Sequence, residues 1–341
     1  MAELAATAPA PPWLLDRVGH VAQNKYDEAV TTAVGACAAA TAGQTCYICH
    51  QALHRHTKEG LVRGCACHTT EGFVHVSCLA EQASMLVAEA LEKNNLDRKV
   101  WDLWHTCGLC KQRYHGEVLC ALGWACWRTY LWRPEWDRIR GLAMNMLGDG
   151  LFKADHHEDA LSVYEAQLSM LRRLGGPGSE RSILITQGNL ANTHQILGRL
   201  EEAGHTCRDI YRGCLKLNGE EDESTIRAAL NCATSFISLQ RFEEAKSLIR
   251  KMMPVALRVL GQENYLTLQM RWNHARTLSR TTAARAFDDI REAVTTLEET
   301  ERTARRIFGG AHPLTVASED SLRTAREVLR VRSDGGRVKF V

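Results

Sequence analysis

The sequence has no strong excess of charge of either sign. Its 341 residues include 42 lysines and arginines and 40 aspartates and glutamates, which gives a formal net charge of +2. Proteins that bind nucleic acids usually neutralise phosphates with an excess of basic residues. We therefore expect no nucleic acid among the main partners.

No hydrophobic run is long enough to cross a membrane. The most apolar stretch, from Val118 to Trp132, is about 15 residues long and contains Arg128, whereas a spanning helix needs roughly 20 apolar residues. The sequence therefore predicts no transmembrane segment. A helix over 119–134 that bridges two domains is favoured over a helix that lies in a membrane interface.

Catalytic motifs and export signals are also missing. The sequence contains no Ser-His-Asp constellation, phosphate-binding glycine loop or paired-carboxylate site. It does not open with a signal-peptide pattern, and its 13 cysteines are an odd number. These features favour reduced thiols. We expect the protein to be cytoplasmic, and a nuclear location stays open.

The sequence does contain four pairs of metal-ligand residues between positions 46 and 110. The pairs are Cys46-x2-Cys49, Cys65-x-Cys67, His75-x2-Cys78 and Cys107-x2-Cys110. A Cys-x2-Cys pair on a tight turn directs both thiolates at one metal ion, and a segment this small rarely folds on its own core. Eight ligands suffice for two Zn2+ ions in closed, structural sites. Buried or disulfide-bonded cysteines are the alternative, which fits these spacings less well.

The order of the pairs resembles a RING-CH (RINGv) zinc finger. The phrases CYIC, GCACHTTEGFVHVSCL and CGLCKQRYHGEV carry the resemblance, together with the seven residues between Cys67 and His75. PHD fingers share this order, but they usually have fewer residues before the histidine and a tryptophan where this chain has His105. RING-type domains are cross-braced. The resemblance therefore implies one zinc ion on Cys46, Cys49, His75 and Cys78, and another on Cys65, Cys67, Cys107 and Cys110.

The RING-CH resemblance also implies ubiquitin ligation. Such a domain binds a ubiquitin-conjugating enzyme that carries ubiquitin as a thioester, and it accelerates transfer by positioning. The residues implied to contact the conjugating enzyme or ubiquitin are Ile48, Leu109 and Lys111. Gln82 stands where the family has a tryptophan, and Leu109 stands where proline is common. Trp101 or Trp104 would have to replace the missing tryptophan contact.

Residues 135–330 repeat with a period of about 42 residues. The similar phrases HHEDA, RLEEA and RFEEA end at Ala160, Ala203 and Ala245. Each unit has two helical stretches, which in the second unit are expected over 182–197 and 200–217, and such units build an α-solenoid. The phrase G-R-[LF]-E-E-A, with HPLT near the end, resembles the tetratricopeptide repeats of kinesin light chains. HEAT-like repeats are the alternative fold.

The first helix of each unit is expected to line a concave binding face. The residues expected to bind a protein or peptide ligand there are Asn189, Asn192, Arg227, Asn231, Asn273 and Arg276. Asparagine can both donate to and accept from a peptide backbone, and arginine favours carboxylates. The alternative is that the asparagines form hydrogen bonds between helices and bind no ligand.

The predicted fold is therefore mostly α: a small cross-braced two-zinc RING-like domain followed by an α-solenoid of tetratricopeptide-type helical hairpins. The expected parts are a tail and helix over 1–40, the zinc domain over 41–118, the bridging helix over 119–134, the repeat array over 135–330 and a loose tail over 331–341. The predicted function is a RING-type ubiquitin ligase whose array recruits substrate. A non-catalytic scaffold is the main alternative, and a PHD-like reader of modified lysine would need an aromatic cage that the sequence does not offer.

Overall fold

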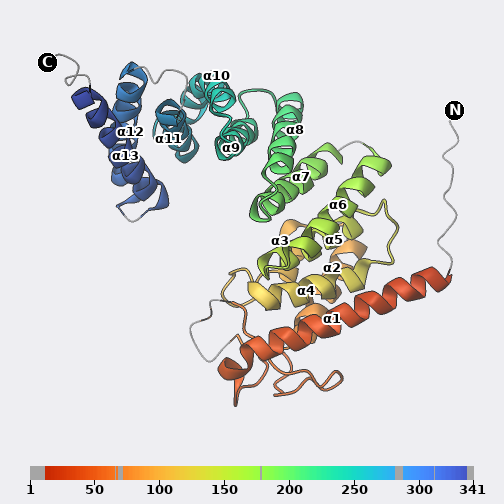
Figure 1. Ribbon diagram of the computed structural model, residues 1–341. Coiled ribbons are helices and arrows are strands. Elements are labelled where there is room, and N and C mark those ends of the chain that lie inside the picture. Colours follow the sequence, from red (N-terminus) through yellow and green to blue (C-terminus); the bar gives the residue numbers. More distant parts are fainter. Residues whose placement is uncertain are drawn as a thin grey trace, which may run out of the picture. The chain divides into compact units, whose positions relative to one another are not determined.

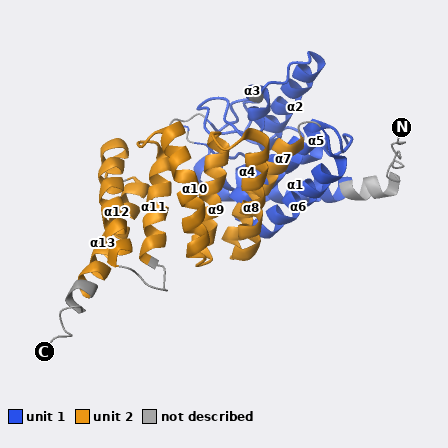
Figure 2. Cartoon of the chain, turned by 90° about the horizontal axis from the view of Figure 1, so that it is seen from above, with its two compact units in different colours: residues 1–176 blue, residues 177–341 orange. Residues whose placement is uncertain are grey.

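The computed structural model describes residues 12–65, 67, 72–176, 179–280, 287–310 and 312–335. The described chain is mostly helical and divides into two compact units, residues 1–176 and 177–341 (Figure 2). Residues 1–11 of the predicted N-terminal tail lie outside the described residues. No helix among the described residues has the length and apolar character needed to span a bilayer.

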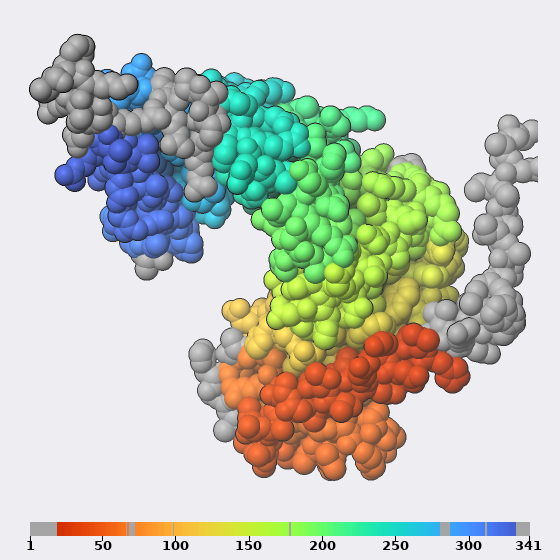
Figure 3. Space-filling view, in the orientation of Figure 1, coloured from red at the N-terminus to blue at the C-terminus, as the bar shows by residue number. Residues whose placement is uncertain are grey.

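Unit 1 begins with the long helix α1 (Pro12–Thr41). Its buried side chains recur every three or four residues, as on one face of a helix: Ala22, Tyr26, Ala29, Val30, Ala33 and Cys37. This face packs against helix α4 (Gly116–Tyr130). The Tyr26 hydroxyl also lies 3.1 Å from Ser77 Oγ, and the Arg63 N–H donates to Cys37 Sγ over 3.3 Å. In the space-filling view α1 (red) therefore lies beside the residues that carry the predicted metal ligands (Figure 3).

The cysteine-rich segment, residues 42–115, has little regular structure in its described part. Its helices are α2 (Val76–Glu92), the short α3 (Arg98–Trp101) and the 3-10 turn η1 (Asp102–Trp104). Two antiparallel bridges, Val62 with Val74 and Thr106 with Arg113, hold its loops together. Trp104 is fully buried and meets the Tyr130 ring edge-on, with 5.7 Å between ring centroids. This contact fixes the segment to α4.

Helices α5 (Arg138–Lys153) and α6 (His157–Leu174) complete unit 1. Helix α5 crosses α4 very closely, because a Cβ atom on Gly150 would lie 2.8 Å from the carbonyl oxygen of Leu119. The bridging helix predicted over 119–134 overlaps α4, which packs against α1 and α5. The α5–α6 hairpin, predicted as the start of the repeat array, lies in unit 1.

Unit 2 consists of consecutive helical hairpins that lie side by side (Figure 1). Its described helices are α7 (Ser179–Ile196), α8 (Leu200–Asn218), α9 (Glu223–Ser238), α10 (Phe242–Leu260), α11 (Tyr265–Arg280), α12 (Phe287–Phe308) and α13 (Pro313–Gly335). Helices α7 and α8 correspond to the stretches expected over 182–197 and 200–217. Helix α13 runs to Gly335, so residues 331–335 of the predicted loose tail are helical, and 336–341 lie outside the described residues.

The repeat period has a structural origin at the helix ends. Gly219, Gly261 and Gly309 follow the last residues of α8, α10 and α12 and have φ angles of 83°, 83° and 87°. Each donates its N–H over 3.1 Å to the carbonyl four residues earlier. Glycine tolerates this left-handed conformation at a helix C-terminus without the penalty that a Cβ would bring. The same terminator thus recurs at the end of each hairpin.

Candidate metal centre

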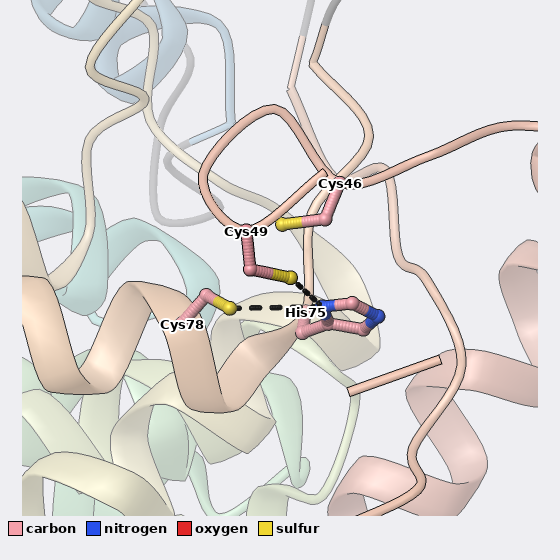
Figure 4. Close-up of side chains that lie close together, drawn as sticks. All are labelled: Cys46, Cys49, His75 and Cys78. Carbon is pink, nitrogen blue, oxygen red and sulfur yellow. Dashed lines mark hydrogen bonds between the residues drawn. The ribbon is translucent and has the colours of Figure 1, made fainter. Parts of the chain in front are cut away.

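The structure brings four of the predicted ligands together in a first cluster. Figure 4 shows the sulfur atoms of Cys49 and Cys78 directed toward the ring of His75, with Cys46 beside them. The Nδ1 atom of His75 lies 3.4 Å from Cys49 Sγ and 3.6 Å from Cys78 Sγ. Tetrahedral zinc would put sulfur and nitrogen ligands about 3.6 Å apart, given metal–ligand distances of about 2.3 Å and 2.0–2.1 Å. The cluster therefore has the dimensions of a zinc site.

A second cluster contains the other four predicted ligands: Cys65, Cys67, Cys107 and Cys110. The sulfur atoms of Cys65 and Cys67 are 3.4 Å apart, and those of Cys67 and Cys107 are 3.8 Å apart. Two thiolates on one tetrahedral zinc ion would be about 3.8 Å apart. In both clusters the ligand atoms lie within 4.8 Å of one another, so each group could hold a metal ion.

The ligand pairs are interleaved between the clusters. The first and third pairs along the chain form one cluster, and the second and fourth pairs form the other. The Val62–Val74 bridge supports this arrangement because it pairs the segment before Cys65 with the segment before His75. Gly72 adds to it: its φ angle is 97°, and a side chain there would come within 2.9 Å of Cys67 Cβ.

The two Cys-x2-Cys pairs sit on the same kind of backbone turn. The N–H of Cys46 donates to Gln51 O over 3.0 Å, and that of Cys107 donates to Gln112 O over 2.8 Å. The residue after each second cysteine, His50 or Lys111, has a positive φ angle of 58° or 59°. Left-handed backbone at a residue other than glycine is uncommon and costs free energy. The turn presents both thiols on one side, as a metal ligand pair requires.

His75 is placed so that a neutral imidazole could offer Nδ1 to a metal ion. The side chain is completely buried, and burial lowers its pKa. Its Nε2 atom lies 3.4 Å from the carbonyl oxygen of Ala52 and can donate to it. Such a hydrogen bond fixes the tautomer and the orientation of a metal-bound histidine.

The clustered thiols differ in acidity. Burial is the main cause that raises the pKa of Cys65, Cys67 and Cys78. In contrast, a backbone hydrogen bond from Gln112 lowers the pKa of Cys110 to about 7. Thiolates this close together repel one another. A cation bound between them would offset this repulsion.

The residues implied to contact a conjugating enzyme lie on the turns of the two clusters. Ile48 is half-buried within the first turn, where its N–H donates to Cys46 Sγ over 3.4 Å. Leu109 is 44 % exposed in the second turn. Lys111 is exposed and donates from Nζ to Gly108 O over 2.5 Å.

Of the two tryptophans that would have to replace the missing contact, the structure excludes one. Trp104 is fully buried against Tyr130, so it cannot touch a partner. Trp101 is half-buried, with its ring centroid 5.8 Å from that of Tyr130. Gln82, at the family's tryptophan position, is exposed on α2, and its exposed neighbours there are Met85 and Leu86.

The residues predicted to line the repeat groove fall into two groups. Asn192 and Asn231 are exposed and line a cavity of about 160 Å3 in unit 2 between the first helices of two neighbouring hairpins and helix α8. Asn189 is half-buried on α7, and Arg227 is exposed on α9, where it forms an ion pair with Glu223. These four residues lie on the first helices of their hairpins, as expected.

Asn273 and Arg276 instead take part in contacts between and within helices. Asn273 is 2 % exposed and donates from Nδ2 to Thr234 Oγ1 over 2.9 Å. Arg276 donates to Asn273 Oδ1 over 3.0 Å and lies over the Trp272 ring, 4.6 Å from its centroid. The row of asparagines expected along the binding face is therefore interrupted at Asn273, because burial leaves no room for a peptide beside it. Asn273 instead forms a hydrogen bond between helices, which is the alternative given in the sequence analysis.

Comparison with known proteins identifies the repeats. Residues 182–258 match the tetratricopeptide-repeat family model. The match lies within unit 2, on helices α7 to α10, and the observed hairpins agree with it. Tetratricopeptide arrays are scaffolds for protein–protein interaction. The match does not extend to the cysteine-rich segment.

The similarity of this chain to solved structures is low. Two crystal structures of the nearly identical TPR-like repeats of a Podosopora anserina protein described as a kinesin light chain are 18 % and 16 % identical to this chain. They cover 58 % and 68 % of it and 90 % and 97 % of their own length, with TM-scores of 0.46 and 0.47. BtubC (BKLC) from P. vanneervenii is 15 % identical over 76 % of this chain and 92 % of its own, with a TM-score of 0.41. No curated protein matches the chain.

Proposed function

We propose that this protein is a RING-type ubiquitin ligase that holds two structural Zn2+ ions and recruits protein substrates through its repeats. The observation that carries the proposal is the interleaved pairing of ligands, first pair with third and second pair with fourth. This pairing is the cross-brace that the RING-CH resemblance implies. The sulfur–nitrogen and sulfur–sulfur distances support zinc as the metal.

In this proposal the zinc ions take no part in the transfer chemistry. Each has four protein ligands and no open position, which is the arrangement of a structural site. Their role is to hold two turns in place, one carrying Ile48 and the other carrying Leu109 and Lys111. These side chains would bind a ubiquitin-conjugating enzyme and its ubiquitin, and the gain in rate would come from orientation.

The repeats would supply the substrate. The cavity that Asn192 and Asn231 line offers amide groups to a peptide backbone. Arg227 lies on the same helix as Asn231, and a ligand carboxylate would bind it by displacing Glu223. The ligand class is therefore an extended protein segment with acidic character. Asn273 is left out of the proposed groove because it is buried, donates to Thr234 of α9 and accepts from Arg276 of its own helix.

A non-catalytic scaffold is the second candidate, and one observation favours it. Gln82 replaces the tryptophan of the family on the exposed side of α2, and Trp104 is too deeply buried to take over its contact. In that case the cross-braced segment would dock a partner without promoting transfer.

Ubiquitin discharge from a panel of charged conjugating enzymes separates the two candidates. Wild-type protein, shown beforehand to hold its zinc, is compared with Ile48→Ala and with a control, Ile185→Ala, which truncates an exposed isoleucine of unit 2. A ligase accelerates discharge with at least one enzyme; Ile48→Ala abolishes the acceleration and Ile185→Ala does not. Failure of the wild type with every enzyme would leave the scaffold as the function.

A further inference from the structure

Unit 1 contains a third cluster of metal-ligand residues, separate from the two described above. Glu117 and Cys120 are three residues apart on α4, so they share one face of that helix. His156 is the N-cap residue of α6, where its N–H donates to Leu151 O and its carbonyl accepts from the Ala160 N–H, both over 3.0 Å. Two helices thus deliver three different ligand types to one place.

The three side chains are close enough to share one ion. Their ligand atoms lie within 4.8 Å of one another, and His156 Nε2 is 3.8 Å from Glu117 Oε2. Cys120 is buried, whereas the side chains of Glu117 and His156 are 28 % and 47 % exposed. The cluster therefore has a buried sulfur at its base and is open to solvent on one side.

The open side faces a small cavity with a negative lining. The cavity measures about 90 Å3 and is lined by side chains of α1, α4 and the α5–α6 hairpin. Besides Glu117, the carboxylates of Glu28 and Asp159 line it, and one ammonium group, that of Lys25, forms an ion pair with Glu28 over 3.0 Å. Carboxylates exceed cations here, so a cation gains Coulomb energy by entering.

The cluster offers one thiol, one imidazole and one carboxylate. The mixed sulfur, nitrogen and oxygen donors suit zinc and cobalt better than magnesium or calcium, which prefer oxygen alone.

We propose that Glu117, Cys120 and His156 form a third metal site that binds Zn2+ with water in the remaining position. The site differs in kind from the two cysteine-rich clusters. Those have four protein ligands each, whereas three ligands beside a cavity leave one coordination position for a small molecule. The site is independent of ligase activity, because it lies on α4 and α6 and uses none of the eight ligands of the cross-brace.

Cobalt titration tests the site. Protein given two equivalents of zinc to fill the cysteine-rich clusters is titrated with Co2+ in the absence of oxygen. We expect a further equivalent of cobalt to bind, with the strong visible bands of a low-coordinate ion and a thiolate charge-transfer band from Cys120. Glu117→Gln, which preserves side-chain shape, and His156→Ala should each weaken this binding by about tenfold or more.

His205→Ala is the matched control, because it removes an exposed histidine of unit 2 and should leave cobalt binding unchanged. The total zinc on the protein is measured in the same samples. The proposal is overturned if wild-type protein binds no cobalt beyond its two zinc ions, if cobalt enters only as zinc leaves, or if both site variants bind it as the wild type does.

Discussion

At the scale of single residues, spacing predicted which cysteine and histidine side chains lie together but could not predict how exposed a repeat position is. The eight residues of the two clusters lie in short motifs, so local sequence identifies them. Asn231 and Asn273 occupy the same position of successive repeats, yet the first is exposed and the second is 2 % exposed. The difference arises from Thr234 and Arg276, which bond to Asn273 and which no repeat motif specifies. The cluster of Glu117, Cys120 and His156 could not be predicted from the sequence for a similar reason, because His156 is far from Cys120 along the chain.

The two asparagines should therefore respond differently to truncation. Asn273→Ala removes the buried hydrogen bonds of Asn273 to Thr234 and Arg276, which should lower the free energy of unfolding by about 1–3 kcal/mol. Asn231→Ala removes an exposed side chain and should change it by less than about 0.5 kcal/mol. Denaturant unfolding of both variants measures the difference. Equal effects would mean that Asn273 does not link α9 to α11 in solution.

At the scale of elements, helices could be predicted from the sequence wherever a local motif marks the end of a helix. The predicted stretches over 182–197 and 200–217 agree with α7 and α8 to within three residues, because a glycine follows each helix pair. The packing of the α5–α6 hairpin on α4 was not predictable in this way. The hairpin resembles a repeat unit locally, and the close approach of Gly150 to Leu119 joins it to α4 within unit 1. Such contacts depend on the packing of helices that are distant in sequence.

The glycine terminators can be tested with a matched pair of substitutions. Gly219 has a φ angle of 83°, and no atom lies within 4 Å of where its Cβ would be, so Gly219→Ala changes backbone energy alone. We expect a loss of about 1–2 kcal/mol. Gly188 lies inside α7 with equally open surroundings, and Gly188→Ala should instead stabilise unit 2 by up to about 1 kcal/mol. Thermal unfolding of the two variants gives the signs; a stabilising Gly219→Ala would contradict the left-handed cap.

At the scale of the whole molecule, the two units have different sources of stability. Unit 2 has apolar cores of its own, such as the one that contains Ile226, Leu230, Met252 and Met270. The cysteine-rich segment of unit 1 has little regular structure, and its loops meet at the two ligand clusters. If the clusters bind zinc as proposed, the net free energy of folding of this segment depends on the bound ions. Metal binding and folding are therefore expected to be coupled in unit 1 alone.

Removing the metal should accordingly unfold the chain in part. A chelator that strips zinc from the ligand clusters should release α2 and the two turns, and it should loosen α1 and α4, because Tyr26 contacts Ser77 and Tyr130 packs on Trp104. Amide hydrogen exchange should then rise by orders of magnitude in α2, α1 and α4, while α9 and α10 keep their protection, since their core contains no ligand. Re-addition of zinc should restore the slow exchange. Unchanged exchange in α2 after verified loss of zinc would show that the segment folds without metal. A matching rise in α9 and α10 would show that both units share one folding transition.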